Sequence, residues 1–126
     1  MILYLDTSGK DKIILQLKTA IGPTGKILSR QTIPVFRTQA EKLLPGLQAF
    51  LKKNQLALKN LKGIETVTQG SSFTALRIGI ATANALAYAL NIPIFSVDAP
   101  EALKKKGRLR LLSPQYDREP QIGQKK

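Results

Sequence analysis

One carboxylate and two hydroxyl groups stand together near the amino terminus, where Asp6, Thr7 and Ser8 precede Gly9. At the end of a strand, an aspartate and the backbone N–H groups of such a turn can contact phosphate and Mg²⁺. The same residue types are common in polar hairpin turns, and taken alone the segment favours that structural interpretation. Because Asp6 is the only metal ligand near this turn, we expect neither a metal site nor a bound cofactor.

Other catalytic chemistry is limited by composition. The 126 residues include no cysteine and no histidine. Disulfides, thiolate nucleophiles, imidazole bases and zinc sites of the Cys/His kind are therefore excluded. The formal net charge is +12, which makes an acidic partner such as RNA worth testing.

Basic residues are concentrated at the carboxyl end of the chain. Half of the net charge lies in residues 104–126, which also lack apolar periodicity. This composition predicts a single folded domain over residues 1–106 and a basic, disordered tail over residues 107–126. The tail could be merely solubilising, or it could contact RNA phosphates. The candidate phosphate contacts are Lys104, Lys105, Lys106, Arg108 and Arg110.

The elements that would position these residues begin with three β-prone segments, at residues 2–7, 13–18 and 26–33. A helix follows to about Lys53, because Thr38 and Glu41 have capping-box spacing and apolar residues then recur at helical intervals. Pro45 lies inside this helix and predicts a kink or a late helix start.

Strands and helices alternate in the second half of the chain. We expect strands at residues 63–68 and 94–97, a long helix at residues 73–90 and a short helix at residues 99–106. The order β-β-β-α-β-α-β-α predicts an α/β fold with a mixed five-stranded sheet on which the helices pack.

The sequence also carries information on cellular location. The longest apolar-rich segment, Ile78–Leu90, is too short for a membrane span. The opening residues lack the basic region and the small-residue cleavage site of a secretory signal. We therefore expect a cytoplasmic protein without a membrane partner.

Three segments resemble the TsaB family, also called YeaZ, whose members are subunits in bacterial tRNA threonylcarbamoyladenosine synthesis. Residues 72–87 (SFTALRIGIATANALA) are similar to the family signature GPGSFTGLRIGIATAKGLA. Residues 1–8 resemble the family opening MILAIDTS, and residues 41–45 (EKLLP) resemble its HSExLLP segment. The resemblance covers roughly residues 1–103, and it implies the single lobe shared by actin, hexokinase, Hsp70 and ribonuclease H-like proteins.

The resemblance implies a non-catalytic subunit that supports TsaD, the subunit that transfers a threonylcarbamoyl group to adenosine 37 of tRNA. Further partners implied are a second copy of the chain, a TsaE-like ATPase and tRNA itself. The second lobe of the family is not expected here, so Asp6, Thr7 and Ser8 would form a vestigial phosphate loop. The alternative is a small basic RNA-binding protein that kept the lobe, and a degenerate ATP-binding lobe is the third interpretation.

Small residues recur at every fourth position of the predicted long helix, at Ala75, Gly79, Ala83 and Ala87. This spacing places them in one narrow stripe that another helix could approach closely. The sequence alone favours packing against the first helix of the same chain, whereas the resemblance favours a partner chain, because TsaB proteins are thought to pair through these helices. The expected interface residues are Leu43, Leu44, Leu47, Ala75, Arg77, Gly79, Ala83 and Ala87.

Overall fold

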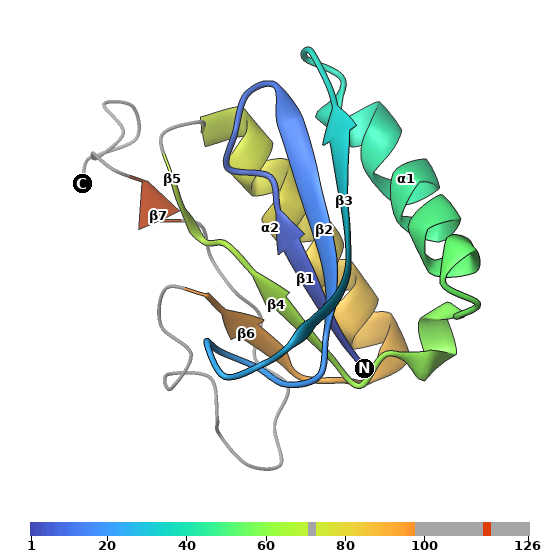
Figure 1. The fold of residues 1–126 in the computed structure, drawn as a ribbon. Coiled ribbons are helices and arrows are strands. Elements are labelled where there is room, and N and C mark those ends of the chain that lie inside the picture. The colour runs from blue at the N-terminus through green and yellow to red at the C-terminus, as the bar shows by residue number, and fades with distance from the viewer. Residues whose placement is uncertain (71–72, 98–114, 117–126) are drawn as a thin grey trace.

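The computed structural model describes residues 1–70, 73–97 and 115–116. A five-stranded mixed sheet dominates the fold (Figure 1), in the order β3-β2-β1-β4-β6. Strands β1, β2 and β3 pair antiparallel, whereas β4 pairs parallel with both β1 and β6. The strands span Ile2–Asp6 (β1), Lys12–Lys18 (β2), Ile27–Pro34 (β3), Gly63–Thr66 (β4) and Ile94–Ser96 (β6). The predicted α/β fold class is confirmed.

The core lies between the sheet and its two described α-helices, α1 (Gln39–Lys53) and α2 (Phe73–Leu90). Alternate residues of β1 point to opposite faces, so Leu3 and Leu5 are fully buried in this core. Both helices contribute to the same core, Leu47 from α1 and Ala83 from α2. Figure 1 shows α2 running behind the central strands and α1 beside β3.

Helix α1 starts differently from the expectation. The Thr38 side chain makes no capping hydrogen bond, because its Oγ1 accepts from the Phe36 N–H at 3.3 Å. The predicted capping box is therefore wrong. The predicted late start is also wrong, since the helix begins at Gln39 and includes Pro45. Pro45 has no N–H to donate to the Glu41 carbonyl four residues earlier. Because both residues are exposed, water can bond that carbonyl instead.

Helix α2 has the predicted bounds, and it is followed by β6 after a turn at Asn91. A short 3-10 helix, η1 (Leu58–Asn60), connects α1 to β4. Among the described residues, no helix is long and apolar enough to cross a membrane.

Part of the predicted disordered tail is a strand. Residues Gln115–Tyr116 form β7, which pairs parallel with β5 (Gln69–Gly70) in a separate two-stranded sheet. A backbone ladder can form there although the segment offers no alternating apolar pattern. The helix expected at residues 99–106 and the basic cluster from Lys104 to Arg110 lie outside the described residues.

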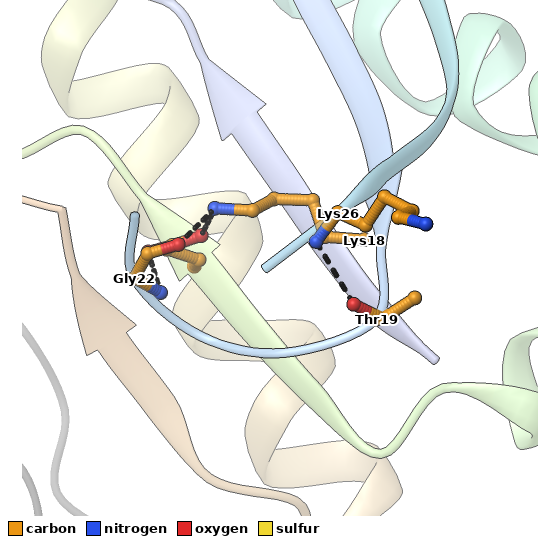
Figure 2. Close-up of polar contacts among 5 residues, drawn as sticks. Lys18, Thr19, Gly22 and Lys26 are labelled. Carbon is orange, nitrogen blue, oxygen red and sulfur yellow. Dashed lines mark hydrogen bonds and ion pairs between the residues drawn. The ribbon is translucent and has the colours of Figure 1, made fainter. Parts of the chain in front are cut away.

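A buried ion pair lies on the sheet face opposite Leu3 and Leu5. Lys18 Nζ is 2.7 Å from Glu65 Oε1 and donates to the Gly22 carbonyl at 3.0 Å. The second carboxylate oxygen of Glu65 accepts from the Gly22 N–H at 2.9 Å. Figure 2 shows how these bonds hold the β2–β3 loop over β4. The Lys18 ammonium also lies 5.6 Å from the centre of the Tyr4 ring, close enough for a cation–π contact.

Candidate functional site

The side chains of the polar turn after β1 already form hydrogen bonds within the chain. Asp6 Oδ1 accepts from the Ser8 N–H at 2.8 Å and from the Ser8 hydroxyl at 2.6 Å. Thr7 is buried, and its hydroxyl donates to the Ala75 carbonyl at 2.8 Å. Thr7 thus joins the end of β1 to the first turns of α2. No group of three or more acidic, histidine or cysteine residues suited to a metal occurs within the described ranges.

The small-residue stripe of α2 faces the interior of the chain. Ala75, Ala83 and Ala87 are at most 2% exposed, and Gly79 is also buried. A Cβ atom added at Gly79 would overlap Thr7 Oγ1 and would lie 2.9 Å from Thr7 Cγ2. The prediction that these four residues meet a partner chain is therefore wrong, because all four are buried within the chain and Gly79 lies against Thr7 just after β1.

The other predicted interface residues divide into two classes. Leu43 and Leu47 are buried in the core, so they are not available for the predicted partner interface. Leu44 and Arg77 remain on the surface, and Leu44 is 47% exposed.

An apolar groove lies where the exposed sides of α1 and α2 meet, and its volume is about 410 Å³. It is lined by Leu44, Ala81, Thr82, Ala85, Leu86 and Ala89. Tyr88, which is 73% exposed, shares a helical face with Ala81 and Ala85. The groove therefore offers a shallow floor of small residues with large apolar side chains beside it.

Sequence reasoning missed this groove although the chain contains a signal for it. Ala81, Ala85 and Ala89 are also spaced by four, so α2 carries a second row of small residues. This second row faces solvent, whereas the row through Gly79 faces the sheet. We name the groove and Tyr88 together the two-helix surface.

A larger cavity, of about 690 Å³, lies at the first turns of both helices. Its walls include Lys10, Phe36, Arg37 and Thr74. The buried Gln39 side chain donates to the Lys10 carbonyl at 3.0 Å and fixes one wall. Arg37 lies over the Phe36 ring at 5.3 Å, so part of the cationic charge in this cavity is already engaged.

Comparison with known proteins finds a family model whose match includes both helices. The family model described as "TsaD: tRNA N6-adenosine threonylcarbamoyltransferase" matches residues 32–122. The chain belongs to this family. Among curated proteins, it is 28% identical over 118 residues to the tRNA threonylcarbamoyladenosine biosynthesis protein TsaB of Bacillus subtilis (strain 168). That alignment spans 92% of this chain and 49% of the relative.

Two solved structures have the same fold. YeaZ from Pseudomonas aeruginosa is 29% identical, with a TM-score of 0.63 over 76% of this chain and 42% of that chain. A second Pseudomonas aeruginosa structure, of an uncharacterised protein with similarity to peptidase YeaZ, gives the same values. The chain is thus TsaB/YeaZ-like, as the signature at residues 72–87 predicts, and it spans less than half the length of these relatives. The predicted actin-like, ribonuclease H-like lobe is confirmed.

Proposed function

We propose that this chain is a non-catalytic subunit in tRNA threonylcarbamoyladenosine biosynthesis and that its two-helix surface binds a TsaD-like catalytic subunit. The observation that carries this proposal is the exposed apolar groove between α1 and α2 in a chain of the TsaD family. The similarity to TsaB of Bacillus subtilis supports the pathway.

The chemistry of the groove fits a helix of a partner. Alanine side chains let two helix backbones approach closely, and Leu44 and Tyr88 would lose exposed apolar area in such a contact. The span that matches the TsaD family model includes both helices. A TsaD-like subunit would therefore present a comparable pair of helices, and the two surfaces could meet about a pseudo-two-fold axis. A second copy of this chain would use the same surface, so homodimer and heterodimer would exclude each other.

Replacing Ala85 with arginine should abolish capture of the partner. The long charged side chain would fill the groove and would have to lose water on association, while the exposed position leaves the monomer intact. The measurement is co-purification with the co-expressed TsaD-type subunit of the same organism, together with light scattering for self-association and thermal unfolding of the free chain.

Ala49→Arg is the matched control, because Ala49 is exposed on α1 and does not line the groove. It should leave capture unchanged. Capture by Ala85→Arg equal to that by wild type would contradict the proposed surface. Equal loss of capture in Ala85→Arg and Ala49→Arg would contradict it as well.

The proposed non-catalytic role leads to a prediction about nucleotide turnover. Ser8 donates its N–H and its hydroxyl to Asp6, and Thr7 donates its hydroxyl to the Ala75 carbonyl, so these three donors of the turn are not free to bind phosphate. We expect no ATP hydrolysis above background in the purified chain and no change in Asp6→Ala. Turnover that is present in the wild type and lost in Asp6→Ala would overturn this view.

A further inference from the structure

Lysines without acidic neighbours gather in the segment that connects α1 to β4. Between Glu41 and Glu65 the sequence contains five lysines and no aspartate or glutamate. Four of these lysines are exposed in the last turn of α1, in η1 and just before β4. We call this set the basic rim, and it consists of Lys52, Lys53, Lys59 and Lys62.

The backbone holds the basic rim on a folded frame. The chain reverses after α1 at Gln55, whose φ is 58°, and the Leu56 N–H then bonds the Leu51 carbonyl at 2.8 Å. Leu56 and Leu58 pack against the core between the two pairs of lysines. The Lys62 N–H bonds the Met1 carbonyl at 2.8 Å, which ties the segment to the start of β1. Figure 1 shows this connection at the end of the sheet where the amino terminus lies.

No described acidic side chain compensates the charge of the basic rim. In the part of the chain that the structure describes, its four ammonium groups make no hydrogen bond or ion pair. Asp6, Asp11 and Glu41 lie at the end of β1, before β2 and in the first turn of α1, which is the opposite end of the sheet. The carboxylate of Glu65 is buried with Lys18. Among the described residues, this end of the sheet therefore carries charge of a single sign.

We propose that the basic rim binds the phosphate backbone of RNA, an inference that rests on the proposed role in tRNA modification. Lysines can neutralise phosphates as point charges, and the resulting attraction is independent of base sequence. The rim includes no aromatic side chain for base stacking, so the contacts are to the backbone. Binding to a membrane surface is disfavoured, because no large exposed apolar side chain lies within residues 52–62 that could anchor in lipid.

The test compares two variants of the full chain that lose the same number of positive charges. The rim variant carries Lys52→Gln, Lys53→Gln, Lys59→Gln and Lys62→Gln. The control removes four exposed charges elsewhere, through Lys12→Gln, Lys26→Gln, Arg30→Gln and Lys42→Gln. The probe is an unmodified tRNA transcript, and its affinity is measured by fluorescence anisotropy across a salt series, after thermal unfolding has shown that both variants fold.

In the rim variant, the slope of log affinity against log salt concentration should become shallower by about 3. Each lost phosphate contact should reduce the magnitude of this slope by about 0.7 to 0.9. In the control variant, this slope should change by less than half as much. Equal slopes in the two variants would overturn the proposal, as would a rim variant that loses binding to anionic lipid vesicles while tRNA binding is unchanged.

Capture of the TsaD-type subunit separates this inference from the proposed function. The rim variant should still capture that subunit, because no rim lysine lines the groove. Unchanged tRNA binding with normal capture would reject the basic rim alone, whereas a failed capture in wild type would reject the proposed function.

Discussion

Replacing Glu65 with leucine should lower the free energy of unfolding by about 3 to 5 kcal/mol, the usual cost of leaving one member of a buried ion pair without its partner. The Lys18 ammonium would keep only the Gly22 carbonyl and the Tyr4 ring, and the Gly22 N–H would lose its acceptor. Both side chains are nearly inaccessible, at 9% and 2%, so water cannot readily replace the carboxylate.

The double variant Lys18→Met/Glu65→Leu should recover most of that stability. Removing both charges leaves apolar side chains of similar size in a buried position, and such exchanges are often neutral or stabilising. Urea unfolding of the two single variants and the double variant gives the coupling between the residues. Lys12→Met, at an exposed lysine of the same strand, is the control and should change stability by less than about 0.5 kcal/mol. A Glu65→Leu variant as stable as the control would show that the Lys18 side chain escapes to solvent at little cost.

The sequence predicts the elements of this fold well, because most of them repeat apolar residues at one clear period. The burial of Leu3 and Leu5 follows from strand alternation, and the bounds of α2 follow from the turn residues before it and Asn91 after it. The Lys18–Glu65 pair could not be predicted. Its members are 47 residues apart, and only the parallel pairing of β1 with β4 brings them together.

The orientation of α2 was the least predictable feature of the candidate site. The helix is apolar or small around most of its circumference, so periodicity does not select the face that meets the sheet. Two rows of small residues have the same spacing, and the contact of Thr7 with Ala75 and Gly79 is one of the tertiary contacts that decide which row is buried. That contact joins residues 68 positions apart and leaves no local signal in the sequence.

Substitutions in the two rows of small residues test which row is buried. Gly79→Ala should destabilise the chain, although alanine is the better helix former by about 1 kcal/mol. The new methyl group would overlap the Thr7 hydroxyl and force α2 away from β1. Ala83→Leu should cost about 1 to 3 kcal/mol or more, because Ala83 is fully buried and the core must be overpacked. Thermal unfolding should show a fall of several degrees for either variant.

Two further variants make the prediction specific. Thr7→Ala removes the hydroxyl that the added methyl group would overlap, so Gly79→Ala should cost much less in that background than in the wild type. Ala85→Leu, in the exposed row, should leave the melting temperature nearly unchanged and should alter only association. The opposite pattern, with normal melting and lost association for Ala83→Leu, would mean that the row through Gly79 meets a partner chain after all. Because the two substitutions add the same atoms to the same helix two residues apart, burial is the only property that separates their expected effects.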